Sequence, residues 1–336
     1  MMPPTAIRRP LTIGTWLLVS GACLILSPLL LAVGAAWSAW SHRPQPLLLA
    51  RLLVAYFYRE LLVLVGCGVL WLASGCGWRI HSAASRRRHF ALLRWFVSGL
   101  SARARELLGI QVAPDTSSAA AAAMRRDGPL LFFSRHAGPG DTVLLIDLLL
   151  TTYDRLPSVV FKESLMLDPS IDLLGHRLPH AALNTAEPED CRRRIQEVSS
   201  KLGPRGVLVL FPEGGNLTAQ RRRASIAKLW RKGRRREAAA GEQLQHVLPP
   251  HPTGALAALQ GNPECDVIFG AHTGLGLAAF PRQLWHDTPI GRTLTTQMWR
   301  VPAAERPGDP DEQVRWLYDW WRRLDEWLEA EGEPLP

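Results

Sequence analysis

Two long apolar stretches lie near the N-terminus of the chain. Residues 11–40 contain no charged residue, and residues 61–78 again contain none. A helix needs about 20 apolar residues to cross the hydrocarbon core of a bilayer, so the first stretch is long enough to cross it. A cleaved signal peptide is the alternative, because residues 32–36 are small enough for a cleavage site. The pattern excludes a protein that is soluble over its whole length.

The second apolar stretch begins at residue 47 but is interrupted by Arg51, Arg59 and Glu60. These charges favour a helix that lies in the membrane interface or re-enters the same leaflet, whereas residues 61–78 alone are just long enough to cross. Arginines flank both stretches, at residues 8–9 and 86–88. If both stretches cross, the excess of positive charge on cytoplasmic loops places both clusters in the cytoplasm. We therefore expect an inner-membrane protein whose remaining part faces the cytoplasm.

Beyond residue 110 the pattern changes to short apolar runs that alternate with longer mixed segments. Such alternation predicts an α/β fold with a largely parallel sheet flanked by helices. The predicted strands are 129–134, 158–162, 206–211 and 266–271, and the predicted helices are 142–150 and 191–202. Residues 111–128 are expected to form a loop or a short surface helix. We divide the chain into membrane-anchoring helices at 1–89 and an α/β domain at 90–336.

The C-terminal segment has apolar residues at helical spacing from Val314 to Leu328, with several tryptophans beside them. This amphipathic pattern predicts a helix that packs on the domain. Contact with a membrane surface is the alternative, although the acidic residues of the segment weaken it at an anionic bilayer.

Charge and cysteine content narrow the possible functions. The 336 residues carry a net charge of +9, and residues 221–236 hold nine basic side chains. Such a segment suits phosphates of an anionic lipid surface or a nucleic acid, and it is also compatible with an ordinary solvated charge run. The five cysteines form no metal-binding or disulfide pattern, which indicates a reducing compartment.

The first segment with candidate catalytic residues is Ser-Arg-His-Ala-Gly-Pro-Gly-Asp at residues 134–141. It follows a predicted strand and opens a predicted helix, and the carboxyl ends of strands are where α/β sheets carry their sites. The Gly-Pro-Gly turn allows His136 and Asp141 to meet. A carboxylate on one imidazole nitrogen fixes the tautomer and leaves the other nitrogen to act as a base.

Two further segments have unusual composition. Phe-Pro-Glu-Gly-Gly-Asn at 211–216 follows a strand, where the two glycines allow close approach of a ligand and Glu213 projects into the same crevice. Its simplest interpretation is a turn from strand to helix, in which Asn216 or Thr218 caps the helix. Val-Leu-Pro at 247–249 opens a stiff proline-rich loop.

In this order and at these separations, the segments resemble the glycerolipid acyltransferase family, which includes the 1-acyl-glycerol-3-phosphate acyltransferases. The family carries a His-x-x-x-x-Asp motif, a basic second motif, a Phe-Pro-Glu-Gly motif and a proline-containing fourth motif. Lys162, followed by the Gly-His-Arg-Leu-Pro segment of Arg177, matches the second motif in part. The resemblance spans about residues 90–327.

The resemblance implies transfer of a fatty acyl group from acyl-CoA or acyl carrier protein to the hydroxyl of lysophosphatidic acid or a related lysophospholipid. His136 would be the general base and Asp141 would orient it. The implied substrate-binding residues are Arg135, Lys162, Arg177, Glu213, Gly214, Gly215, Asn216 and Pro249. No metal or organic cofactor is implied, and the expected partners are the two substrates and membrane lipid, not nucleic acid.

The chain departs from the family pattern at two places. Leu-Asn-Thr at 183–185 stands where the family commonly has an arginine, and Gly-Gly-Asn at 214–216 stands where it usually has Gly-Thr-Arg. Arginine at such places suits bidentate contact with a phosphate. The Asn-Leu-Thr sequence resembles the branch that includes lysocardiolipin acyltransferase, so the acceptor is open between lysophosphatidic acid and another lysophospholipid. Arg177 is a possible replacement for the missing phosphate contact, or a surface residue.

Two other functions compete with acyl transfer. The chain could be a membrane-tethered protein without catalysis that binds lipid or nucleic acid through residues 221–236. A hydrolase using the same histidine and aspartate is the third possibility, and thioester cleavage without an acceptor would reveal it.

Overall fold

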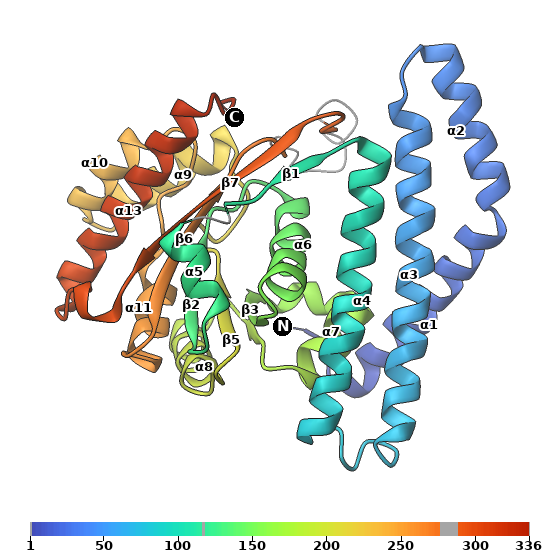
Figure 1. The fold of residues 1–336 in the computed structure, drawn as a ribbon, viewed down its shortest axis with the longest axis horizontal. Helices are drawn as coiled ribbons and strands as arrows, with labels where there is room; N and C mark the ends of the chain where they lie inside the picture. Colours follow the sequence, from blue (N-terminus) through green and yellow to red (C-terminus); the bar gives the residue numbers. More distant parts are fainter. Residues whose placement is uncertain (1, 116–117, 276–287, 336) are drawn as a thin grey trace. The chain divides into compact units, whose positions relative to one another are not determined.

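The computed structural model describes residues 2–115, 118–275 and 288–335, and it divides into two compact units. Unit 1 comprises residues 1–109 and 161–185, and unit 2 comprises residues 110–160 and 186–336. The predicted boundary at residues 89 and 90 falls inside a helix of unit 1 (Figure 1). Unit 1 also takes in a segment from the middle of the α/β sequence.

Unit 1 is built mainly from helices (Figure 1). They are α1 (Thr5–Ile25), α2 (Ser27–Ser41), α3 (Gln45–Ala73), α4 (Ala83–Leu108) and α7 (Pro169–Arg177), with a 3₁₀ helix at Glu163–Leu167 and a short strand, β4 (Ala181–Leu183). α3 packs against α1, α2 and α4. The Ser82 hydroxyl caps the N-terminus of α4, and Gly109 ends the helix in the left-handed conformation.

The first apolar stretch is not the single straight helix that its length suggests. α1 and α2 meet at a bend of 61°, and only together are they long and apolar enough to cross a bilayer. Pro28 explains the break, because it has no N–H to continue the helix and its ring disfavours helical backbone before it. The Ser27 hydroxyl donates to the Leu24 carbonyl, at 2.7 Å, at this break. α3 is long and apolar enough to cross a bilayer by itself.

A buried ionic group joins the helices of unit 1. The Asp172 carboxylate of α7 accepts hydrogen bonds from Arg8 at 2.6 Å and from Arg9 at 2.8 Å, both on the first turns of α1. Nearby, the Tyr56 hydroxyl of α3 donates to Asp168 at 2.9 Å. Burial opposes ionisation of Asp172, but hydrogen bonds from His176 and Arg9 lower its pKa to about 2. The start of α1 is therefore fixed to α7 by charge as well as by packing.

Unit 2 is an α/β unit with a mostly parallel sheet. Its strands are β1 (Gln111–Ala113), β2 (Leu130–Ser134), β3 (Leu156–Lys162, whose last two residues belong to unit 1), β5 (Gly206–Leu210), β6 (Asp266–His272) and β7 (Thr293–Val301). They follow one another across the sheet in the order β1-β7-β6-β2-β5-β3. β2 is central and parallel to both neighbours, with Phe133 opposite Leu210 of β5 and Ser134 opposite Gly270 of β6. β7 is antiparallel to β6.

Helices cover the sheet of unit 2 (Figure 1). They are α5 (Ala119–Arg125), α6 (Pro139–Asp147, continued by a π-helical turn at Leu148–Thr152), α8 (Pro188–Ser200), α9 (Ala219–Arg231), α10 (Arg235–Gln243), α11 (Pro252–Gly261) and α13 (Pro310–Ala330), with a 3₁₀ turn at Ala303–Glu305. α11 packs on β2 and β5, and α13 packs on β6. β2 and β5 are buried along their whole length, as their continuous apolar runs predict.

The predicted strands and helices of unit 2 are confirmed with small shifts at their ends. The C-terminal helix packs on the domain, because Leu317, Trp321 and Leu324 are fully buried and Trp320 stacks on Phe269 of β6 at 4.7 Å. The prediction for residues 111–128 is wrong in part. That segment forms β1 and α5, and the alanines of α5 are mostly buried because the helix packs on β7.

Candidate active site

Three neighbouring strands end where the predicted site lies. β5, β2 and β6 run parallel and side by side, so their carboxyl ends share one edge of the sheet. Beyond β2 come Arg135 and His136, beyond β5 comes the Phe-Pro-Glu-Gly segment, and β6 ends at His272. The sheet thus brings together residues that are more than 130 positions apart in the sequence.

His136 and Asp141 are in contact, as the spacing predicts. The Nδ1 atom of His136 lies 3.1 Å from both carboxylate oxygens of Asp141. Because an ionised carboxylate only accepts, Nδ1–H is the donor and Nε2 is the nitrogen that can take up a proton. The ring also packs on Phe211 beyond β5, with centroids 4.6 Å apart. The imidazole is therefore held at one nitrogen and along one face.

Backbone amides of the turn hold Asp141 in its ionised form. Its Oδ2 accepts the Ala137 N–H at 2.7 Å and the Gly138 N–H at 3.1 Å, and its Oδ1 accepts the Thr142 hydroxyl at 3.2 Å. The residue lies in the first turn of α6, where the helix dipole favours negative charge. Burial opposes ionisation, but the contacts with His136 and His272 hold the pKa of Asp141 well below its usual range.

Glu213 ties the three motif segments of unit 2 together. One carboxylate oxygen accepts the His136 N–H at 2.9 Å, and the other accepts the Leu248 N–H at 3.0 Å. Leu248 precedes Pro249 of the fourth motif, which is also buried. Burial raises the pKa of Glu213 to about 7, against the lowering effect of the two N–H donors. The side chain is 2% exposed, so its contacts are those of a clamp that positions the backbone of His136.

The glycines after Glu213 form an exposed turn beside His136. Gly214 has φ of +67°, a conformation that residues with a side chain rarely adopt, and an added Cβ would lie 3.1 Å from the His251 ring. Its N–H donates to the Phe211 carbonyl. Gly215 and Asn216 are half-buried, and the Asn216 carbonyl accepts a hydrogen bond from Arg221.

Arg135 is fully buried, next to His136 in the chain. Its guanidinium donates to the His272 carbonyl at 2.6 Å and to Glu333 in the C-terminal tail at 2.9 Å. Glu333 also accepts the Gly274 N–H at 3.2 Å. These contacts join the end of β2, the end of β6 and the C-terminal tail, and they indicate a structural role for Arg135.

His272 was not predicted as a site residue, although its Nε2 atom lies 3.5 Å from Asp141 Oδ2. Glu333 was missed as well. The rule that strands deliver chemistry at their carboxyl ends would have found His272, because it is the last residue of β6. No local pattern marks Glu333, whose partner Arg135 is 198 positions away.

Lys162 and Arg177, the predicted basic residues of the second motif, belong to unit 1. Lys162 is exposed at the end of β3. Arg177, at the end of α7, donates to the Cys67 carbonyl at 2.8 Å and lies 3.1 Å from His89. Its guanidinium therefore binds α3 and α4 within its own unit.

The arrangement can withdraw a proton from an alcohol and stabilise the imidazolium that results. In the parts of the chain that the structure describes, no group of three or more His, Cys, Asp or Glu side chains is placed to hold a metal ion. A family model described as Acyltransferase matches residues 116–252. No curated protein and no solved structure matches the chain. The matched range includes His136, Asp141, Glu213 and Pro249, and residues 116–252 are therefore an acyltransferase domain of the glycerolipid acyltransferase family.

Proposed function

We propose that this protein is a membrane-attached acyltransferase that moves a fatty acyl group from acyl-CoA or acyl carrier protein to the free hydroxyl of lysophosphatidic acid or a related lysophospholipid. His136 is the general base, and Asp141 orients it. The observation that carries the proposal is the contact of His136 Nδ1 with the Asp141 carboxylate inside a domain of the acyltransferase family.

The reaction follows from the chemistry of the two substrates. The acceptor hydroxyl gives its proton to His136 Nε2 while its oxygen attacks the thioester carbonyl. The tetrahedral intermediate then breaks the carbon–sulfur bond, and the thiolate leaves with the proton that His136 returns. A positioned base contributes about 10²–10⁴-fold to such a step. No covalent acyl-enzyme is needed, because the thioester is already activated.

Asp141 and Glu213 have separate tasks in this scheme. Asp141 keeps the Nδ1–H tautomer and stabilises the imidazolium. Glu213 holds the His136 backbone and the Leu248 segment at a fixed separation. Since the Gly214 N–H is bound to Phe211, the neighbouring Gly215 N–H is the candidate donor for the developing oxyanion.

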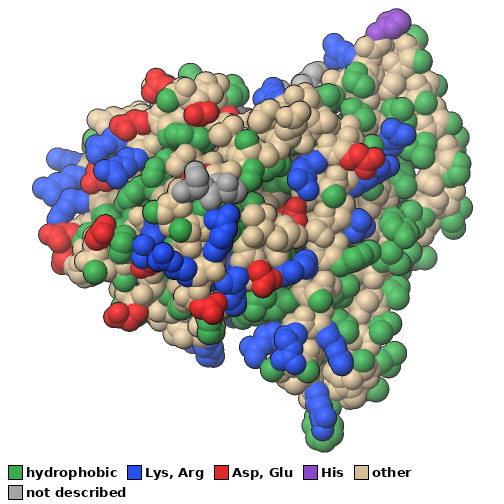
Figure 2. Space-filling view, in the orientation of Figure 1, with side chains coloured by type: hydrophobic (Ala, Val, Ile, Leu, Met, Phe, Trp, Pro, Cys, Tyr) green, Lys and Arg blue, Asp and Glu red, His purple; other side chains and the backbone are tan. Residues whose placement is uncertain are grey.

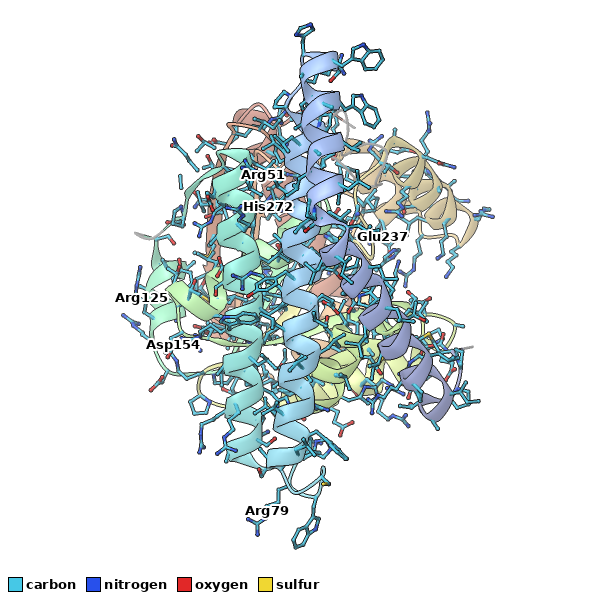
Figure 3. All side chains as sticks on the ribbon, turned by 90° about the vertical axis from the view of Figure 1, so that its right-hand side faces the viewer. Arg51, Arg79, Arg125, Asp154, Glu237 and His272 are labelled. Atoms are coloured by element: carbon cyan, nitrogen blue, oxygen red, sulfur yellow. The ribbon has the colours of Figure 1, made fainter. Side chains whose placement is uncertain are left out.

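The apolar surface of unit 1 supports membrane attachment. Most of the large hydrophobic side chains that are exposed among the described residues lie on α1, α2 and α3, including Leu18, Ile25 and Trp40. Figure 2 shows hydrophobic side chains along α2. Exposed apolar patches of this extent mark interaction sites, and here the apolar sequence favours lipid. Arg79 extends from the turn between α3 and α4 (Figure 3), which places positive charge at one end of the helices.

We further propose that unit 2 faces the cytoplasm and that the basic segment, residues 221–236, contacts anionic lipid. The segment forms α9 and the first residues of α10, and most of its basic side chains are exposed. Arg222 is an exception, because it donates to the carbonyls of Glu242 and Leu244. Each exposed basic residue near an anionic surface contributes on the order of 1 kcal/mol.

The test is an acyl-CoA consumption assay on purified protein in detergent, across a panel of lysolipid acceptors. His136→Ala should remove transfer while the protein stays folded and membrane-bound. His81→Ala, at an exposed histidine of unit 1, is the matched control and should retain full activity. More than about a tenth of wild-type activity in His136→Ala would contradict the role of the base. Thiol release without an acceptor would instead identify a hydrolase.

A further inference from the structure

Asp141 lies between two histidines that come from different strands. His136 follows β2 and contacts Oδ1 and Oδ2 at 3.1 Å, and His272 ends β6 and lies 3.5 Å from Oδ2 (His272 is labelled in Figure 3). His272 is 9% exposed, and neither of its ring nitrogens has a hydrogen-bond partner among the described residues. A buried imidazole without a hydrogen-bond partner is unusual, because buried polar groups are normally paired.

We propose that His272 is a positioning residue of this site, and that its imidazole and that of His136 share the single carboxylate of Asp141. The expected effect on the rate of acyl transfer rests on the proposed function. The expected effect on proton binding by His136 does not. His272 lies outside the residues that the family model matches.

The charged and titratable groups around His272 are few among the described residues. Asp141 of α6 lies against its ring, and the Arg135 guanidinium binds its carbonyl. His136 contacts the same Asp141 carboxylate. Glu333 of the C-terminal tail neutralises Arg135 and also accepts the Gly274 N–H. Thr296, opposite His272 on β7, carries no charge. Asp141 is therefore the acidic group in contact with the His272 ring.

Sharing one carboxylate couples the two histidines. When His272 binds a proton, it forms an ion pair with Asp141 and places a positive charge close to His136. A like charge on the same carboxylate disfavours the binding of a second proton. His136 then stays neutral, and able to act as a base, at lower pH. Protons are taken up in two steps that belong to the pair and not to either residue.

The variant that tests this coupling is His272→Gln, whose side chain stays polar but cannot bind a proton. The acid limb of kcat/KM against pH should become a one-proton limb and should move to higher pH by about one unit. His272→Leu, which also removes the polar side chain, should show the same shift. His246→Gln is the matched control, because His246 is equally buried in unit 2 but interacts with Asp325 instead of Asp141. That control should leave the profile unchanged.

A second measurement needs no activity. Histidine labelled at Cε1 gives one NMR signal for each of the ten histidines, and the His136 signal is assigned by its loss in His136→Ala. In wild type, the His136 titration should be broad and lie at lower pH than in His272→Gln. An unshifted His136 titration, with a loss of activity that is equal at every pH, would overturn the proposal. Absence of transfer by wild type would contradict the proposed function, while the titration would still decide whether the carboxylate is shared.

Discussion

Replacing Asp141 by asparagine removes the charge of the site but keeps its shape. The backbone amides of Ala137 and Gly138 both point at Oδ2, so the asparagine carbonyl must occupy that position. The new NH₂ group then points at His136 Nδ1 and donates to it. This hydrogen bond places the ring proton on Nε2, and the base that faces the acceptor is lost.

The expected loss of activity is therefore large, about 10²–10⁴-fold, although the histidine remains. His136→Ala, which removes the imidazole itself, should be at least as severe. Stability should also fall, because hydrogen bonds to a charged group contribute about 1.5–3 kcal/mol each and neutral ones about 0.5–1.5. With some relaxation of the turn, we expect a decrease of about 1–3 kcal/mol in the free energy of unfolding at pH 7.

The pH dependence of this difference has a definite sign. The pKa of Asp141 is held below its usual range in the folded protein, so its contribution to stability is fully present above the ordinary pKa of about 4. It is lost as the pH falls toward the lower, folded-state pKa. The stability advantage of wild type over Asp141→Asn should therefore shrink below about pH 4.

Two measurements test the prediction. Initial rates of acyl transfer give the loss of activity, and denaturant unfolding in detergent from pH 3 to pH 8 gives the change in stability. Asp147→Asn, the same substitution at the end of the same helix, is the matched control and should retain activity. If Asp141→Asn kept more than about a tenth of wild-type activity, the tautomer reasoning would be refuted. A stability difference that did not change with pH would refute the assignment of the charge.

Three further predictions concern the rest of the molecule. Asp172→Asn should lower the free energy of unfolding by about 3–5 kcal/mol, because Arg8 would stay buried without its ion-pair partner. Asp190→Asn, at an exposed ion pair, is the control and should change the free energy of unfolding little. Equal effects of the two substitutions in denaturant unfolding would contradict this prediction. Reversal of Arg231, Arg235 and Arg236 to Glu should reduce turnover on anionic vesicles far more than in neutral micelles, and increasing salt should narrow that gap. Equal loss in both would mean direct contact with substrate, and no loss would indicate a solvated charge run. Glu197→Cys, at an exposed position of α8, should react with an impermeant thiol reagent only after the cells are opened. Labelling of this cysteine in intact cells would contradict the proposal that unit 2 faces the cytoplasm.

The site was predictable from sequence wherever its parts are local. His136 and Asp141 are five positions apart around a Gly-Pro-Gly turn, so the turn predicts that they can meet, and the structure shows the contact. The same holds for the central strands, because β2 and β5 are buried on both faces and appear in sequence as continuous apolar runs. The break between α1 and α2 is also local, since Pro28 is visible in the sequence, but the size of the bend is not.

The sequence by itself determined the class of fold, the histidine–aspartate pair and the apolar helices, because each depends on residues within one or two turns of one another. Only the tertiary structure decided the order of the strands and the partners of the buried charges. Glu213 reaches His136 across 77 positions and Arg135 reaches Glu333 across 198, and no periodicity encodes such distances. His272 comes within 3.5 Å of Asp141 only because β6 lies beside β2. Burying a charge is costly unless it is paired, and the packing of the folded chain decides which residue lies close enough to pair with it.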